Sequence, residues 1–459
     1  MIDRSVASAI LTKCLKGGAD FAELFFEERR EGVIGMLSGE IEAATSALEL
    51  GVGLRVMRGL KSVYTYGNDL GGQGLEALAV NALAALKAAP METEDVVLNP
   101  AKRIRPVIEI PPADVELVRK TEIVRQADAG ARGRESITQV NVTLADVTQR
   151  VRILNSEGLD VSDQRTRVRL SVVATAGGSG ENQTGHEGPG AASGYEFFEK
   201  VVDPRSVGRQ AAKTADTMLK AESCPKGIFP VVIYGGFGGV IFHEACGHAL
   251  ESSFVSKGIS VFSNKLGEAI ASPKVTAVDD GVIPWGWGSL GVDDEGFRTQ
   301  RNLLIEEGVL KSYMVDRMGA RRMDHPRTGN GRRQSYRYAP TSRMTNTFIE
   351  AGPDDEEEMI RTLGEGLVAK KMGGGSVNPA TGEFNFAVNE GWWVKDGRIV
   401  MPVRGATLIG KGQEILFCID SVGKKVSLGQ GMCGSFSGSI PVNVGQPTIR
   451  VSRIAVGGR

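Results

Sequence analysis

The residues best suited to chemistry lie in one short segment, His243 to Glu251, which reads HEACGHALE. The chain contains only four histidines, and two of them, His243 and His248, lie here five positions apart, with Glu244 directly after the first. Neutral imidazoles are common zinc ligands, and an adjacent glutamate can act as a general base toward a water molecule at the metal. The segment therefore predicts a metal site able to hydrolyse a substrate.

The spacing of the two histidines constrains the backbone between them. In a regular α-helix, positions five apart differ by roughly 140° around the axis, so the two imidazoles could not reach one metal ion. A π-type widening, with i→i+5 hydrogen bonds, would bring them back toward one face. Gly247 directly precedes the second histidine and weakens a regular helix there. We therefore predict a bulged helix that carries both histidines.

A catalytic zinc site needs a third protein ligand and one open position. Cys246 and Glu251 are candidates within the segment itself. A distant candidate is Cys433, which lies in the glycine-rich stretch 429–434 (GQGMCG), where the backbone can approach a neighbour closely. Two imidazoles and one thiolate would leave the metal centre with a net positive charge and able to lower the pKa of water. Residue types alone leave the choice among these candidates open.

Each of these features also has an alternative interpretation, either structural or catalytic. The two histidines could be one core residue and one exposed residue, and Cys433 could be a buried apolar thiol. Cys246 could be a nucleophile with a neighbouring histidine as its base, which would make the protein a thiol-dependent hydrolase. A metal-dependent amidase would use the same water chemistry as a peptidase. The other two histidines, His186 and His325, lack metal-ligand spacing and are predicted at the surface.

Two other patterns resemble binding motifs. Residues 236–239 (GFGG) could imitate a phosphate-binding loop, but no Lys-Ser/Thr pair follows, so we predict a tight strand-to-helix turn. Asp279-Asp280 and Asp293-Asp294-Glu295 are acidic clusters that could hold a divalent cation. Solvated turns are the simpler interpretation of both clusters, and we expect them there.

The composition excludes several classes of protein. The 459 residues carry 54 Lys and Arg against 55 Asp and Glu, a net charge of −1 that gives no global field for nucleic acid. Apolar runs are too short for a transmembrane helix, for which about 18 residues are needed, and the first residues lack the pattern of a signal peptide. An odd, scattered set of five cysteines argues against a disulfide framework. We expect a cytoplasmic protein without a membrane partner.

Periodicity predicts two domains of different architecture. In residues 1–222, helices are expected near 4–15, 75–89, 114–131 and 206–221, with strands over 21–66 and 136–173 and a long exposed loop over 177–194. In residues 223–459, a short strand at 229–234 leads into the histidine helix. Short strands between glycine turns then follow, with one helix at 355–370. The predicted class is α+β: an N-terminal antiparallel sheet with helices, then a β-rich, barrel-like domain that carries the bulged metal-binding helix.

Several motifs of the second half resemble those of one family, the TldD/PmbA metalloproteases. They run collinearly from the histidine segment to near the C-terminus, and the chain is most similar to the TldD-type catalytic subunit. The first half matches more diffusely, mainly at residues 51–56 (GVGLRV). The motifs of the second half are at 238–251, 278–281, 293–296, 328–333, 343–347, 371–375, 405–410 and 444–448.

The resemblance implies a ligand set and a reaction that spacing alone does not give. Family members hold one zinc ion per chain, and the matching residues here are His243, His248 and Cys433, with Glu244 as the catalytic base. The implied activity is hydrolysis of peptide bonds in small or unfolded peptides. Such peptides are expected to lie extended, adding a strand to a sheet beside the metal.

The resemblance also implies an assembly. The active site is expected inside a dimer cavity, so that the N-terminal domain serves dimer and cavity formation. The partner is a second copy or a PmbA-type, TldE-like subunit that lacks the metal motif. Because this chain keeps the whole motif, it is predicted to be the catalytic type. A non-catalytic peptide-binding subunit and a thiol hydrolase using Cys246 remain the alternative hypotheses.

Overall fold

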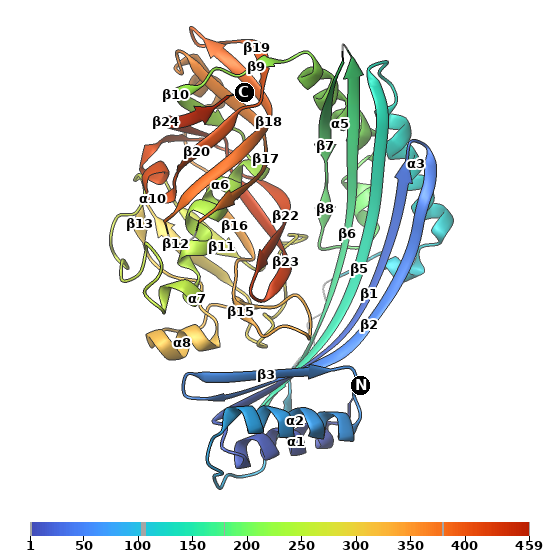
Figure 1. Cartoon of the computed structure of the whole chain (residues 1–459), viewed down its shortest axis with the longest axis vertical. Helices are drawn as coiled ribbons and strands as arrows, with labels where there is room; N and C mark the ends of the chain where they lie inside the picture. The colour runs from blue at the N-terminus through green and yellow to red at the C-terminus, as the bar shows by residue number, and fades with distance from the viewer. Residues whose placement is uncertain (1, 102–106, 179, 379–380, 459) are drawn as a thin grey trace.

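The computed structural model describes residues 2–101, 107–178, 180–378 and 381–458. It has an elongated N-terminal sheet that stands beside a β-rich C-terminal half (Figure 1). The resulting mixed α+β architecture, with a closed barrel of five strands, confirms the predicted fold class. None of the described helices is long and apolar enough to cross a membrane.

The N-terminal sheet is built from unusually long antiparallel strands. Its order is β3-β2-β1-β5-β6-β4, with β7 and β8 also paired to β6. Tight turns at residues 38–39, 59–60 and 156–158 join consecutive strands. The strands are β1 (Phe21–Leu37), β2 (Glu40–Arg58), β3 (Lys61–Gly67), β4 (Asn99–Pro100), β5 (Ile137–Asn155), β6 (Leu159–Gly178), β7 (Glu181–Glu187) and β8 (Gly190–Ala191).

Helices cover the sheet in two places. At one end, α1 and α2 pack on the beginning of β1 and the end of β2 (Figure 1). Further along, α3 and α5 bury the alternating apolar residues of β5 and β6. These two helices approach closely at Gly208, where an added Cβ would lie 2.0 Å from the carbonyl oxygen of Ala127. The helices are α1 (Arg4–Lys16), α2 (Gly72–Leu86), η1 (Pro112–Asp114), α3 (Leu117–Ala131), α4 (Glu196–Lys200) and α5 (Pro204–Leu219).

The C-terminal half contains a closed barrel. The ring β17-β10-β24-β20-β18 closes because β17 pairs with both β10 and β18. Further strands extend it, among them β9, β19 and β21. The strands are β9 (Glu222–Ser223), β10 (Gly227–Ile233), β17 (Gly366–Val377), β18 (Glu383–Lys395), β19 (Arg398–Arg404), β20 (Thr407–Lys411), β21 (Ile419–Val422) and β24 (Ile449–Gly457).

A six-stranded sheet, ordered β13-β12-β11-β16-β23-β22, lies beside the barrel and ends in β22 as an edge strand. Short helices connect the two structures. The remaining strands are β11 (Ala277–Asp280), β12 (Arg301–Glu306), β13 (Val309–Leu310), β14 (Gly331–Arg332), β15 (Thr341–Ser342), β16 (Asn346–Ile349), β22 (Ser427–Ser435) and β23 (Gly438–Gln446). The helices are η2 (Phe237–Gly239), α6 (Val240–Phe242), η3 (His243–Gly247), η4 (His248–Leu250), α7 (Ser252–Val255), α8 (Arg317–Met323), α9 (Glu356–Arg361), α10 (Gly412–Ile415) and η5 (Leu416–Cys418).

Two predicted elements are wrong. Residues 177–194, expected as an exposed loop, contain β7 and β8. Gly185 lets β7 lie directly on α5, because an added Cβ there would be 2.0 Å from the carbonyl oxygen of Ala211. The helix predicted over 355–370 ends at Arg361, and Gly364 takes a left-handed φ of 71°. The apolar residues that follow are buried in β17, where pairing with β10 and β18 outweighs helix propensity.

The expectation of solvated acidic turns is also wrong for four of the five carboxylates, while the fifth, Asp280, is partly exposed. Asp279, Asp293, Asp294 and Glu295 are at most 1% exposed. Asp279 accepts hydrogen bonds from the backbone N–H and hydroxyl of Thr345, at 2.7 and 2.8 Å. Backbone and side-chain donors therefore satisfy these carboxylates inside the protein.

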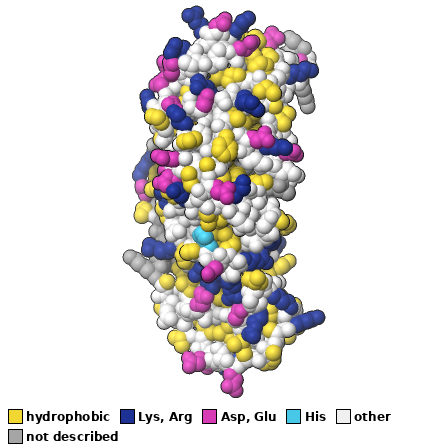
Figure 2. Space-filling model, turned by 90° about the vertical axis from the view of Figure 1, so that its left-hand side faces the viewer, with side chains coloured by type: hydrophobic (Ala, Val, Ile, Leu, Met, Phe, Trp, Pro, Cys, Tyr) yellow, Lys and Arg dark blue, Asp and Glu magenta, His cyan; other side chains and the backbone are white. Residues whose placement is uncertain are grey.

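Asp294 and Glu295 belong to a buried ion network that joins the two halves of the chain. The Asp294 carboxylate lies 2.5 Å from the Arg165 guanidinium of β6, and the Glu295 carboxylate lies 2.7 Å from Arg55 of β2. Arg333 in turn reaches Glu23 of β1, at 2.5 Å. Because each charge is paired away from water, the network fixes the C-terminal half against the sheet. By contrast, charges of both signs are interspersed on the outer face of the protein (Figure 2).

Replacing Asp294 by Asn tests this network. The change leaves the Arg165 charge buried with less compensation, and we expect it to lower the free energy of unfolding by about 3–5 kcal/mol. The matched control is Glu358→Gln, which breaks an exposed ion pair with Arg361 and is expected to cost less than about 1 kcal/mol. Chemical denaturation followed by circular dichroism measures both. Equally small effects would contradict a stabilising role for the network.

Candidate metal centre

The histidine segment forms a π-helical turn, as the spacing predicts. Strand β10 is followed by a turn in which Gly236 has a φ of 70°, and this turn leads through η2 and α6 into the π segment η3. The backbone N–H of His248 donates to the carbonyl of His243, a hydrogen bond across five residues. The imidazoles consequently lie close together, with ring centroids 5.0 Å apart. The bulged helix and the strand-to-helix turn at residues 236–239 are thus confirmed.

Close packing surrounds this turn on two sides. An added Cβ on Gly247 would lie 2.3 Å from the sulfur of Met344. On α10, an added Cβ on Gly412 would lie 2.0 Å from the carbonyl oxygen of Ala245. Gly247 has ordinary helical dihedral angles, φ −53° and ψ −53°, so close packing rather than backbone freedom accounts for the glycine, a reason that the sequence alone did not give.

Strand β22 brings Cys433 to the two histidines. Its Sγ lies 3.2 Å from Nε2 of His243 and 3.2 Å from Nε2 of His248. All three side chains are buried, and their three donor atoms lie within 4.8 Å of one another. Zinc bonds of about 2.0–2.3 Å at tetrahedral angles place donor atoms roughly 3.3–3.6 Å apart. The three donors are thus positioned to hold a metal ion of this size.

Glu251, a candidate ligand from the sequence, has a different position. Its carboxylate is fully buried and lies 3.0 Å from Nδ1 of His248. An Nδ1–H that donates to a carboxylate fixes the tautomer and leaves the Nε2 lone pair free toward Cys433 and a metal. Nδ1 of His243 is also buried, and it has no hydrogen-bond partner among the described residues.

The charges at the cluster suit a cation. Burial alone would raise the pKa of the Cys433 thiol, but the neighbouring His243 and His248 outweigh it and lower the pKa to about 3. Burial opposes the protonated form of His248, yet Glu251 and Cys433 raise its pKa well above the ordinary value, so a metal ion would displace a proton from Nε2 of this imidazole. A thiolate and two imidazole nitrogens that face one another form a soft donor set of the kind that zinc prefers.

Glu244 follows the first histidine and lies at the edge of the cluster. One of its carboxylate oxygens is 3.7 Å from Nε2 of His248, and its side chain is 24% exposed. Because the three donor side chains beside it are buried, Glu244 is the group of this turn that solvent can reach. The structure thus places an accessible carboxylate next to the donor atoms.

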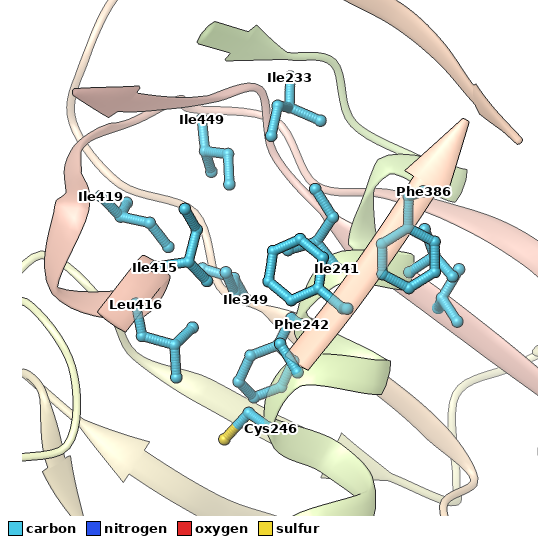
Figure 3. Close-up of a cluster of buried hydrophobic side chains, with 14 of the residues drawn as sticks. Ile233, Ile241, Phe242, Cys246, Ile349, Phe386, Ile415, Leu416, Ile419 and Ile449 are labelled. Atoms are coloured by element: carbon cyan, nitrogen blue, oxygen red, sulfur yellow. The ribbon is translucent and has the colours of Figure 1, made fainter. Parts of the chain in front are cut away.

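Cys246, the other candidate in the segment, is in a different environment. It is 0% exposed, and its side chain lies in the apolar core beside Phe242 and below Leu416 (Figure 3). Burial raises the pKa of its thiol, which opposes both nucleophilic and ligand roles. The remaining histidines lie elsewhere: His186 is exposed on β7, and His325 is partly exposed after α8.

Sequence reasoning did not single out Arg343 on its own, although this fully buried side chain supports the cluster. Its guanidinium donates to the carbonyl oxygens of Cys433, at 2.6 Å, and Gly438, at 3.0 Å. Its Nε lies 3.8 Å from a carboxylate oxygen of Glu251. Arg343 thus connects the strand that carries Cys433 with the carboxylate that orients His248. No local pattern marks such a residue, because its partners are distant in the sequence.

A large cavity of about 1020 Å³ lies beside the cluster, between the N-terminal sheet and the barrel. Residues from α5, β7, β17 and β22 line it, including Gly431 and Met432 next to Cys433. Among the described residues of its lining, none belongs to the cluster itself. The cavity therefore offers space for a substrate next to the candidate metal ligands.

Family models match three consecutive parts of the chain. The PmbA/TldA metallopeptidase C-terminal domain matches residues 226–458, the central domain matches residues 110–219, and domain 1 matches residues 22–86. A metalloprotease TldD homolog of Haemophilus influenzae is 37% identical over 96% of this chain and 93% of the relative. A metalloprotease of Methanocaldococcus jannaschii is 32% identical over 96% of this chain and 97% of the relative.

Solved structures share the fold at lower sequence identity. TldE from Thermococcus kodakarensis has a TM-score of 0.77 and 19% identity, covering 99% of this chain and 100% of that one. A proposed modulator of a DNA gyrase from Thermotoga maritima has a TM-score of 0.80 and 22% identity, covering 99% of both chains. The chain belongs to the PmbA/TldD metallopeptidase family, which confirms the resemblance stated from the sequence.

Replacing Gly247 by Ala tests whether the π-helical turn depends on close packing. The added methyl group would meet the sulfur of Met344, and we expect a loss of about 1–3 kcal/mol in unfolding free energy. Gly434→Ala in β22 is the matched control, since no atom lies within 4 Å of its added Cβ. Thermal unfolding compares the two variants. A Gly247→Ala protein as stable as the control would contradict this packing argument.

Proposed function

Starting from membership of this metallopeptidase family, we propose that the chain is a zinc-dependent peptidase that hydrolyses peptide bonds in small or unfolded peptides. The observation that carries the proposal is the convergence of His243, His248 and Cys433, with Glu244 beside them. A structural zinc site is usually closed by four protein ligands, whereas three ligands leave a position for water or substrate.

We assign the zinc ligands to Nε2 of His243, Nε2 of His248 and Sγ of Cys433, one ion per chain. When bound, zinc would supply Lewis acidity that polarises the substrate carbonyl and lowers the pKa of water. Glu251 acts on His248 as a positioning residue, because its carboxylate holds the Nδ1 proton. Arg343 fixes the backbone at Cys433 and thereby the direction of its thiolate.

Glu244 performs the proton transfers in this proposal. Its carboxylate accepts a proton from the attacking water and then delivers it to the nitrogen of the leaving amine, so the group returns to its starting state. Its partial exposure allows water and a peptide to approach, while its neighbours on the turn remain buried. The adjacent position in the sequence keeps this carboxylate beside the metal without making it a ligand.

The peptide is proposed to bind extended along β22, the edge of the six-stranded sheet. This edge is bridged to Gly236 at Leu428, and the carbonyls of Gly431 and Cys433 already accept from Trp287 and Arg343. A peptide would therefore pair mainly with the N–H groups of residues 431–435, in contacts that depend little on side-chain sequence. β22 carries Cys433 and borders the large cavity, so a chain added to this edge would pass the metal. This arrangement favours unfolded segments over folded proteins.

We further propose that residues 1–222 serve dimer and cavity formation, while residues 223–459 form the metallopeptidase domain. Residues 40–50 of β2 extend past the part that pairs with β3, and they expose Ile41, Leu48 and Leu50. Such an edge is suited to a second copy of this chain or to a PmbA-type, TldE-like subunit. The five free thiols agree with a cytoplasmic location for this assembly.

Metal content tests the assignment of the third ligand. We expect about one zinc per chain in the wild type, a strong loss in Cys433→Ser, and retention in Cys246→Ser, since Cys246 lies in the apolar core. Elemental analysis of the three proteins, with peptide cleavage assayed on the same samples, measures this. Zinc retained without Cys433 but lost without Cys246 would transfer the ligand role to Cys246.

Glu244→Gln tests the catalytic proposal. The amide keeps the size of the side chain but cannot accept the proton, so we expect zinc content to be unchanged and cleavage to fall by about 10²–10⁴-fold. Peptide cleavage is followed by mass spectrometry, with elemental analysis as the control for metal loading. Full activity of this variant would overturn the role of Glu244 as general base.

A further inference from the structure

Three arginines follow one another at alternate positions of β6, so they point from the same face of the sheet toward the C-terminal half. They differ in how their charges are compensated. Arg165 is neutralised by Asp163, at 3.1 Å, and Asp294, at 2.5 Å. Arg167 donates to the carbonyl oxygens of Trp287, at 2.8 Å, and Ser289, at 3.3 Å. The third, Arg169, lines the large cavity.

The side chain of Arg169 has no hydrogen-bond or ion-pair partner among the described residues, and its Nε is a buried, unpartnered atom. Burial also lowers the pKa of its guanidinium, because the charged form lacks compensation. The guanidinium carbon lies 5.8 Å from the centre of the Trp287 ring, within the range of a cation–π contact. This contact can orient the guanidinium but leaves its N–H donors free.

The other charged groups at the cavity are paired. Lys370 lies 2.8 Å from Glu390, Lys371 pairs with Glu187, and Arg404 pairs with Glu181. The Asp203 carboxylate caps the first turn of α5. Among the described residues that line the cavity, Arg169 is thus the cation without a counter-ion. An uncompensated guanidinium at the wall of a large cavity is suited to an anionic ligand.

Trp287 connects Arg169 to the proposed peptide path. Its indole N–H donates to the carbonyl oxygen of Gly431, at 3.0 Å, and Gly431 precedes Cys433 by two residues on β22. At about 3.3 Å per residue, an extended peptide of a few residues can reach from the metal-binding cluster to Arg169. A carboxylate is the anion that such a peptide carries, at its C-terminus or on an acidic side chain.

We propose that Arg169 forms a subsite that binds a carboxylate of the peptide, a few residues from the bond to be cleaved. The inference rests on the proposed peptidase function and adds a specificity determinant to it. The guanidinium would form two parallel hydrogen bonds with the carboxylate oxygens and so fix the position of the extended chain. Peptides with a suitably placed carboxylate would bind more tightly than their uncharged analogues.

Binding of short labelled peptides tests the subsite. Glu244→Gln serves as the background to limit turnover, and fluorescence anisotropy gives the dissociation constant. The two peptides of the first pair differ only in whether the C-terminus is free or amidated. The second set has amidated C-termini throughout, and each of its pairs differs only in whether one position carries Glu or Gln. This position is moved along the peptide from pair to pair. We expect one of these changes to alter affinity by about ten- to hundredfold, which identifies the source of the carboxylate.

Variants assign the effect to Arg169. Arg169→Gln is expected to abolish the discrimination, and Arg169→Lys to retain part of it, because lysine keeps the charge but not the paired donors. Arg404→Gln is the matched control and should discriminate as the background protein does, since Arg404 is already paired with Glu181. Because the two peptides of a pair are compared on one protein, a general loss of folding cannot imitate the result.

The proposal is overturned if neither change affects binding to the background protein, if that protein binds none of the peptides, or if Arg169→Gln still discriminates. These outcomes are separate from those for the peptidase function. Metal-dependent cleavage without any preference for a carboxylate would leave the peptidase function intact and remove the subsite. If discrimination depends on Arg169 but the wild-type protein cleaves no peptide, the subsite is supported and the peptidase function is contradicted.

Discussion

One backbone hydrogen bond, from the N–H of His248 to the carbonyl of His243, determines the geometry of the candidate site. It replaces the i→i+4 bond of a regular helix and reduces the angular separation of the two histidines. Without it, a single sulfur could not lie 3.2 Å from both Nε2 atoms. The π turn is less favourable locally than an α-helix, so the surrounding structure has to stabilise it.

That stabilisation comes from elements far apart in the chain. Met344 follows β15 and packs against Gly247, while α10 approaches the turn through Gly412. Arg343 adds hydrogen bonds to the strand that carries Cys433 and lies near the carboxylate of Glu251. The same region of the chain therefore contacts the turn, the third donor and the carboxylate that orients His248. The contacts that pack the C-terminal half therefore also position the three donor atoms.

The sequence predicted the local features of the site and missed those that depend on distant contacts. The spacing of His243 and His248 has one simple geometric solution, so the bulge could be derived from the residues alone. The proximity of Cys433 to the histidines could not be derived in this way, because it depends on how β22 pairs, and only the family resemblance favoured Cys433 as a ligand. The long strands of the first half have clear alternation and hairpin turns, and the structure has them where expected.

The wrong predictions also result from contacts between residues that are distant in the sequence. A helix over 355–370 was expected from its residue types, but the barrel requires residues 366–377 as β17. The acidic clusters were interpreted from charge, which in a single sequence usually indicates solvent. Their partners Arg55 and Arg165 lie on strands more than 100 residues away, so no local pattern reveals that the charges are paired.

The row of arginines on β6 leads from the buried ion network to the cavity. Along β6, Arg165 is held by carboxylates and Arg167 by backbone carbonyls of the C-terminal half. These two contacts fix the distance between the N-terminal sheet and the segment between β11 and β12 that carries Trp287 and Asp294. Arg169 is the next residue of this row, and at its position the two halves separate to form the cavity. The row of arginines that joins the halves at Arg165 thus ends, four residues further along β6, in a charge at the wall of the cavity.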